Sequence, residues 1–169
     1  PNHVSSFPYA EGWEGGFGLW TNVAGDDFNW AQRSGSTPSS GTGPSGAHSG
    51  TYYVYVEASS PNYPNQTTIL EGPCFDLANT SDADLTFWYH MLGSAVGTLY
   101  VEVPEDCVTW TPVWTLSGDQ GDAWHEASVD LSAYVGQIIT VRLRGVTGSS
   151  WQGDICIDDL SVTVTPAIP

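Results

Sequence analysis

The chain has 169 residues, 40% of them hydrophobic and 13% charged, so it carries enough apolar material for one domain with a sizeable core. Its 19 Asp and Glu residues stand against three Arg and no Lys, which gives a formal net charge of −16. Because phosphate binding needs Lys and Arg, this balance excludes nucleic acid as a partner and disfavours sulfated or uronic-acid glycans. There is no apolar run of about 18 residues, so no membrane insertion is expected.

Short runs with apolar residues at every second position follow one another along the chain and predict β-strands. With 19 Gly and 11 Pro, few segments could sustain a helical period. Pro73 inside the second run predicts a bend or a bulge. In chain order, the runs are 51–58, 68–77, 84–92, 97–103, 110–116, 124–131, 138–146 and 155–164.

This number of strands, with turn signals between them and no βαβ rhythm, predicts an all-β fold. The expected architecture is an antiparallel jelly-roll-like β-sandwich. The expected domain covers residues 7–164, with linker segments at 1–6 and 165–169. Because the chain starts at Pro1 and has no signal peptide, we expect it to be a segment of a larger protein.

The stretch from Asp26 to Ala47 joins two adjacent carboxylates and two aromatic residues to a long loop of Ser, Thr, Gly and Pro. A loop of this length is either disordered or held for a purpose. A second carboxylate pair, Asp158 and Asp159, follows a β-branched run near the other end of the domain. Two such pairs suggest a hard-cation site that ties the chain ends together.

Calcium takes about six to eight oxygen ligands. The first and last strands of a jelly roll lie close together, so we predict a structural calcium site, with sodium as the alternative ion. Asp27 and Asp159 are the strongest candidate ligands, followed by Glu14. The alternative is that these residues cap turns, and that Asp26 and Asp158 bond loop amides. The full candidate set is Glu11, Glu14, Asp26, Asp27, Asp158 and Asp159.

Several motifs, in their order, resemble those of the MAM domains of extracellular proteins. Any one of them is weak, but their joint order and spacing are specific, and together they cover roughly residues 7 to 164. The motifs are EGWEGGFGLW at 11–20, DDFNW at 26–30, TPSSGTGP at 37–44, YYVYVEA at 52–58, LTFWYHMLG at 85–93, VGTL at 96–99, SGDQG at 117–121 with Trp124, and GDICIDDL at 153–160.

Animal members of this family usually carry an early cysteine pair that this chain lacks, so the match is closer to bacterial versions on secreted enzymes and surface proteins. The resemblance implies a non-catalytic adhesion or binding module, secreted or at the cell surface. Its partners would be neighbouring domains of the parent protein and a protein or neutral glycan ligand. Two alternatives stay open: a dedicated carbohydrate-binding module for a neutral polysaccharide, and a structural or processing domain with no ligand.

Sugar-binding modules stack Trp and Tyr faces on sugar rings, and aromatic residues on loops mark candidate binding surfaces of this kind. Trp151, in the turn-rich segment 148–153, is the first candidate and Tyr63 is the second. Most other tryptophans are expected in the core, because large aromatics dominate β-sandwich interiors. The loop from Ser34 to Gly50 could contact a ligand. We favour a structural Ω-loop, pinned by hydroxyl-to-backbone bonds and by Trp30.

Catalysis is not indicated. No histidine has a nucleophile at a motif spacing, and the HExxH and GxSxG motifs are absent. Paired carboxylates can hydrolyse glycosides. The Asp pairs here are sequence neighbours, however, and neighbours on a strand point to opposite faces.

The three cysteines lack the CxxC spacing of zinc sites. One disulfide with one free thiol fits a secreted protein, although a reduced cytosolic protein stays open. Cys74 and Cys156 lie in strands that could be neighbours in a jelly roll, so they are the preferred pair. Cys107 would then be free.

Overall fold

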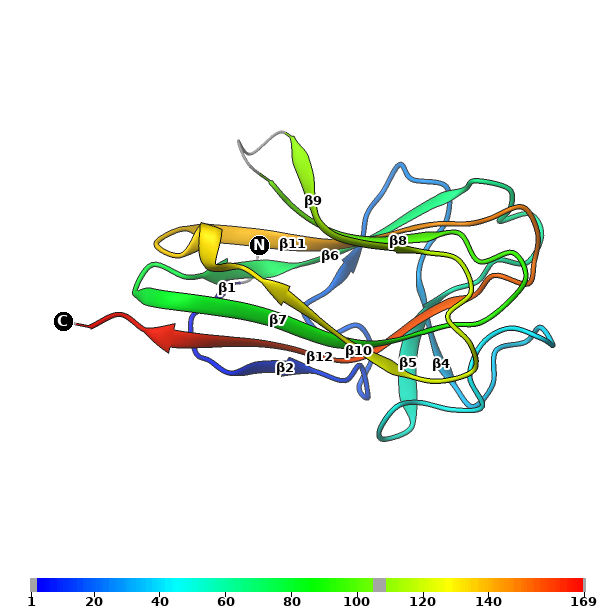
Figure 1. Ribbon diagram of the computed structural model, residues 1–169, viewed down its shortest axis with the longest axis horizontal. Coiled ribbons are helices and arrows are strands. Elements are labelled where there is room, and N and C mark those ends of the chain that lie inside the picture. The colour runs from blue at the N-terminus through cyan, green and yellow to red at the C-terminus, as the bar shows by residue number, and fades with distance from the viewer. Residues whose placement is uncertain (1–2, 105–108, 169) are drawn as a thin grey trace.

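The computed structural model describes residues 3–104 and 109–168, in which two six-stranded sheets pack face to face (Figure 1). The all-β sandwich is therefore confirmed. Sheet A has the order β1-β6-β11-β8-β9, with β3 paired to β6, and sheet B has the order β10-β7-β12-β5-β4, with β2 paired to β12. Among the described residues the one helical element is the 3-10 helix η1 (Ser132–Tyr134), and none is a helix that could span a membrane.

The strand bounds follow the alternating runs of the sequence closely. Sheet A consists of β1 (His3–Val4), β3 (Thr21–Asn22), β6 (Thr67–Asp76), β8 (Thr98–Pro104), β9 (Trp110–Ser117) and β11 (Ile138–Val146). Sheet B consists of β2 (Tyr9–Glu11), β4 (Ala31–Ser34), β5 (Tyr52–Val56), β7 (Thr80–Met91), β10 (His125–Asp130) and β12 (Ile155–Pro166). The first four strands are two to four residues long, which is too short for a period to show in the sequence.

The core lies between the sheets, because every second residue of each long strand points inward. Leu99, Val101 and Val103 of β8 are buried as their alternation predicts. Trp30 closes one side of this core, where its indole N–H donates to the Thr68 carbonyl oxygen at 3.1 Å. Burial of large apolar side chains of this kind is the main favourable contribution to the stability of such a sandwich.

Two of the irregularities in the strand pairing bear on the predictions. In β6, two residues that include Pro73 oppose one residue of β11, which confirms the predicted bulge. In β12, the pairing with β7 shifts between Asp158 and Ser161, and Asp159 has a φ of 48°. Asp tolerates this left-handed region better than most residues. The second bulge breaks the alternation of side chains at the Asp pair.

The two ends of the chain belong to the sandwich. β2 pairs with β12, so the first and last parts of the chain meet as predicted. His3 and Val4 pair with β6 as a parallel strand, and Val4 is buried. The strands thus begin at His3 and extend to Pro166, so parts of both segments expected to be linkers lie in the sheets.

The predicted Cys74–Cys156 disulfide is wrong, because both cysteines are free thiols. Cys74 is on β6 of sheet A, whereas Cys156 is on β12 of sheet B. The two strands are not neighbours but lie in opposite layers, and Cys74 instead contacts Thr140 of β11, with 3.7 Å between Sγ and Oγ1. Cys107, expected to be free, lies outside the described residues.

Candidate functional site

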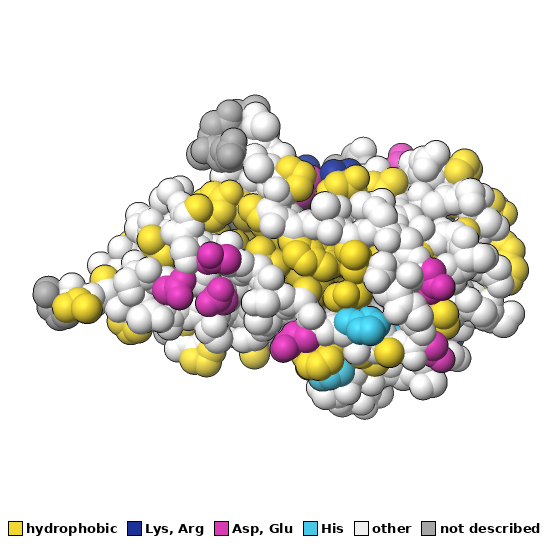
Figure 2. Space-filling view, in the orientation of Figure 1, with side chains coloured by type: hydrophobic (Ala, Val, Ile, Leu, Met, Phe, Trp, Pro, Cys, Tyr) yellow, Lys and Arg dark blue, Asp and Glu magenta, His cyan; other side chains and the backbone are white. Residues whose placement is uncertain are grey.

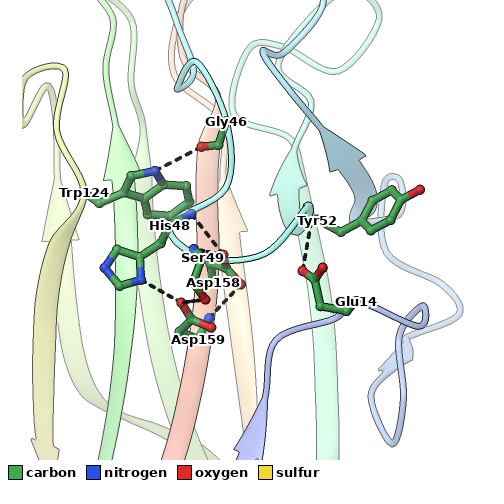
Figure 3. Close-up of polar contacts among 8 residues, drawn as sticks. All are labelled: Glu14, Gly46, His48, Ser49, Tyr52, Trp124, Asp158 and Asp159. Carbon is green, nitrogen blue, oxygen red and sulfur yellow. Dashed lines mark hydrogen bonds and ion pairs between the residues drawn. The ribbon is translucent and has the colours of Figure 1, made fainter.

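The loop between β4 and β5 crosses the outer face of sheet B, where it packs against aromatic side chains (Figure 3). The His48 ring stacks on Trp88 of β7, with 3.9 Å between the ring centroids and 15° between the planes. The indole N–H of Trp124 donates to the Gly46 carbonyl oxygen at 3.1 Å. Residues 35–50, called the crossing loop below, are therefore fixed on the sheet rather than disordered.

The carboxylate of Asp158 accepts hydrogen bonds from the backbone of the crossing loop. Its Oδ2 accepts the backbone N–H groups of His48 at 3.0 Å and Ser49 at 3.2 Å, and its Oδ1 accepts that of Asp159 at 2.8 Å. The carboxylate is fully buried. Burial raises the pKa of Asp158 to about 6, although the three N–H donors act in the opposite direction.

Asp159 contacts the side chains of the same loop. Its Oδ2 lies 2.6 Å from Nδ1 of His48 and accepts the Ser49 hydroxyl at 2.6 Å. We expected neighbouring carboxylates on a strand to face opposite ways, and this is wrong for Asp158 and Asp159. The positive φ at Asp159 and the bulge in β12 turn both side chains toward one loop.

A third carboxylate comes from the beginning of the chain. Glu14 accepts the backbone N–H groups of Thr51 at 2.7 Å and Tyr52 at 2.9 Å, just where the crossing loop enters β5. Figure 3 shows the bond to Tyr52. Glu14 and Asp159 both border Gly12, where a Cβ atom would lie 3.9 Å from Cγ of Glu14 and 3.5 Å from Oδ1 of Asp159. Carboxylates from both chain ends thus border the loop, but the two Asp pairs do not meet as predicted, because Asp26 and Asp27 bond the backbone of β6.

The other predicted ligands lie elsewhere. Asp26 and Asp27 accept the backbone N–H groups of Ile69 and Thr67, each at 2.7 Å, along the edge of β6 in sheet A. Glu11 accepts the backbone N–H of Trp13 at 2.9 Å. These three carboxylates thus behave as the alternative to a cation site predicts. They accept backbone N–H groups that the short strands leave unpaired.

The six candidates therefore do not form one ligand set for calcium. In residues 3–104 and 109–168, no group of three or more His, Cys, Asp or Glu side chains is arranged to hold a metal ion. Calcium would also compete with the amide donors that the carboxylate oxygens already accept. The residues present fit direct clamping of the loop better than they fit an ion, and calcium binding itself stays a prediction.

Hydroxyl groups fix the first half of the crossing loop in place, as the sequence predicted. The Thr37 hydroxyl donates to the Thr42 carbonyl at 3.1 Å, and the Thr42 hydroxyl donates to the Leu92 carbonyl at 2.7 Å. Trp30 was expected to pin the loop, but its indole N–H bonds to β6. Trp124 and His48 have that role instead, and no sequence pattern marks them, because their partners are distant in the chain.

Several loops gather beside the crossing loop and present the predicted ligand-binding aromatics. Trp151 is 37% exposed and Tyr63 is half-buried. The loops that carry them are joined, since the Asn65 N–H donates to the Thr147 carbonyl at 3.2 Å. Gln152, next to Trp151, accepts the Ser94 hydroxyl at 2.9 Å and thereby fixes the indole-bearing loop.

A shallow groove of about 500 Å³ lies against the crossing loop, lined by residues 36–45 with Leu92 and Asp122. Beneath the loop, Asp154 is fully buried and accepts the Ala58 N–H at 2.9 Å. Burial, with a smaller contribution from the nearby carboxylate of Glu57, raises the pKa of Asp154 to about 6. This part of the molecule combines a fixed loop surface with buried acidic anchors.

The sequence profile of one protein family, "MAM domain, meprin/A5/mu", matches residues 12–166. The chain belongs to the MAM domain family. A MAM domain-containing glycosylphosphatidylinositol anchor protein 2 from Mus musculus is 31% identical over 165 residues, covering 88% of this chain and 17% of that protein. MAM domain-containing protein 2 from Homo sapiens is 36% identical over 143 residues, covering 82% of this chain and 20% of that protein. The domain thus spans about a fifth or less of these relatives.

Solved structures share the fold of this MAM domain. The K1 cleaved adhesin domain of Lys-gingipain from Porphyromonas gingivalis W83 aligns with a TM-score of 0.68 at 20% identity, covering 97% of this chain and 100% of that one. The CBM27-1 module of Caldicellulosiruptor saccharolyticus, solved in complex with mannohexaose, aligns with a TM-score of 0.61 at 13% identity, covering 94% and 97%. At these identities the likeness concerns the fold.

Proposed function

We propose that this MAM domain is a non-catalytic recognition module of a larger secreted or cell-surface protein, and that it contacts a protein ligand with the loops around Trp151. The observation that carries the proposal is an exposed indole on a loop held in place by its neighbours. A rigid aromatic gains contact area with little loss of conformational freedom, which is why Trp and Tyr dominate the energetics of many interfaces.

The proposal of a module in a longer protein is supported by the relatives, which contain several times the length of this chain. Their printed names describe anchor proteins and MAM domain-containing proteins. An adhesive role agrees with membership of this family, and an extracellular location is the natural setting for it. Among such modules the surface loops vary more than the core does. The ligand is therefore determined by the loops and not by the fold.

Recognition of a neutral glycan is the second candidate function. It is supported by the likeness to the sandwich solved with mannohexaose and by the strongly acidic composition, which favours uncharged over sulfated chains. A spacer or processing role without any ligand is the remaining alternative. An array of purified extracellular proteins distinguishes recognition of a protein from a role without any ligand.

The array is probed with the tetramerised domain, because tetramers raise the avidity of weak contacts. The proposal expects specific binding that is lost with Trp151→Ala and weakened with Tyr63→Ala. Leu19→Ala is the matched control, since Leu19 is 36% exposed, much like Trp151, but lies far along the chain between β2 and β3. No specific binder, or a binder that Trp151→Ala leaves unchanged, would overturn the proposal.

A further inference from the structure

Two of the three arginines of this acidic chain lie side by side on the outer face of sheet A. Arg142 and Arg144 of β11 both bind the carboxylate of Glu102 on β8, with Nε to Oε1 distances of 2.8 and 3.1 Å. The Arg142 guanidinium lies 4.2 Å from the centre of the Trp110 ring, and that of Arg144 lies 3.8 Å from the centre of the Tyr100 ring. We call these five residues the arginine ladder.

Four of the five ladder residues, all but Trp110, belong to two rows that run across the strands. Directly opposed residues of neighbouring strands share a face of the sheet. One row is Ile69, Arg144, Tyr100 and Thr115, and the other is Glu71, Arg142, Glu102 and Pro112. Each row crosses β6, β11, β8 and β9, which span roughly 14 Å at the usual strand spacing of about 4.8 Å.

The face is bordered on both sides. β9 and the segment after β3 are at opposite edges of sheet A, and both rise above β8 and β11 in Figure 1. A hollow of about 340 Å³, lined by residues 23–27 with Thr67 and Ile69, continues the first row beyond β6. In Figure 2, dark blue Lys or Arg atoms lie at the upper edge of the molecule, over this sheet.

The charges of the rows cancel, although the whole chain carries −16. Arg144 contributes the positive charge of the first row. In the second row, Glu71 and Glu102 outweigh Arg142 by one negative charge. The two rows and Trp110 therefore offer guanidinium donors, carboxylate acceptors and aromatic rings with no net charge, while Asp26 and Asp27 add two carboxylates in the adjoining hollow. A hydroxyl group both donates and accepts hydrogen bonds, so a polyhydroxylated, uncharged ligand matches this set.

A role in stability alone does not account for the ladder. The side chain of Glu102 is 4% exposed and those of the arginines are 18% and 24% exposed, so three charged groups lose much of their hydration. Apolar residues of similar size are often as stabilising as such a pair or more so. The ladder does fix both guanidinium groups in advance, which lowers the entropic cost of binding a ligand.

We infer that the outer face of sheet A binds a neutral oligosaccharide across the strands, with the arginine ladder contacting its hydroxyl groups. The ligand lies along the row from Thr115 to Ile69 and reaches the hollow beside the β3–β4 segment. This site is separate from the loops around Trp151, so it goes beyond the protein contact proposed above. Either one can fail without the other.

The test is titration calorimetry with mannohexaose and cellohexaose, two neutral hexasaccharides, with a heparin hexasaccharide as the anionic probe. We expect at least one neutral probe to bind, and Arg144→Gln and Tyr100→Ala each to lower its affinity at least tenfold. Thr115→Glu tests the same path without substituting a ladder residue, since Thr115 is exposed on β9 opposite Tyr100. Arg33→Gln is the matched control, because Arg33 is outside the ladder and bonds the Ser36 carbonyl.

Thermal melting shows whether each variant folds. If a ladder variant does not fold, the affinity of Thr115→Glu decides the test. Binding that only Trp151→Ala abolishes would overturn this inference and place the glycan at the loops. Binding of the heparin probe alone would overturn it as well, and would make the ladder an anion site. No binding of either neutral probe at millimolar concentration also overturns it.

Discussion

The buried carboxylate of Asp158 allows the clamp on the crossing loop to be tested quantitatively. Asp158→Ala removes three hydrogen bonds from backbone N–H donors to an ionised acceptor. Each buried N–H donor left without its acceptor costs about 1–3 kcal/mol, which gives roughly 4–5 kcal/mol for the three donors. The pKa of about 6 already includes these bonds, and it means that keeping Asp158 ionised at pH 7 costs the fold free energy. A shift of about two units corresponds to about 2.7 kcal/mol, which the substitution recovers at neutral pH.

The net expectation is a loss of about 2 kcal/mol of unfolding free energy at pH 7. In a protein of this size, that lowers the melting temperature by roughly 4–8 °C. Urea unfolding gives the free energy, and hydrogen exchange shows whether the amides of residues 46–52 lose protection. Glu126→Ala is the matched control, because it removes an exposed carboxylate from the outer side of β10. Equal stability of the two variants would refute the clamp.

The remaining predictions concern pH, calcium and the thiols. Asp154 and Asp158 have a pKa of about 6 in the fold, above their usual value, so the folded state binds protons more tightly than the unfolded chain. Their contribution to stability is present below about pH 4 and is lost as the pH rises through about 6. The melting temperature should therefore rise as the pH is lowered from 7 to 5, and Asp154→Asn should flatten that rise. If the sequence-based calcium prediction holds, calcium raises the melting temperature and Asp159→Asn abolishes the rise; equal melting in EDTA would leave direct clamping as the whole account. Cys156 is fully buried, and burial raises the pKa of its thiol, so iodoacetamide should label it after denaturation and spare it in the native protein, as peptide mass spectrometry can show. Native labelling at the rate of a free thiol would contradict this.

The sheets were predictable because their signal is local. Alternation in segments such as 97–103 and 138–146 places Val101 and Val141 inward whatever the partner strands are. The same alternation failed at Asp159, where one residue with positive φ reverses the direction of a side chain. The disulfide prediction failed for a related reason. It depended on which strands become neighbours, and that order is set by long-range pairing.

The candidate sites were predictable in part. The exposure of Trp151 follows from the Gly and Ser residues around it, and the structure confirms it. The meeting of Glu14 with the Asp pair follows from the closeness of the chain ends. The arginine ladder could not be found in the sequence beyond the shared face of Arg142 and Arg144. Its aromatic partners come from strands whose register with β11 no local pattern reveals.

The function proposed for this MAM domain is recognition of a protein through the loops around Trp151. The most direct measurement is the affinity of the strongest array ligand for the wild type, Trp151→Ala and Leu19→Ala, by titration calorimetry. We expect Trp151→Ala to lose about 2 kcal/mol or more of binding free energy, the size of an interface hot spot, and Leu19→Ala to bind like the wild type. Equal binding by all three proteins would contradict it.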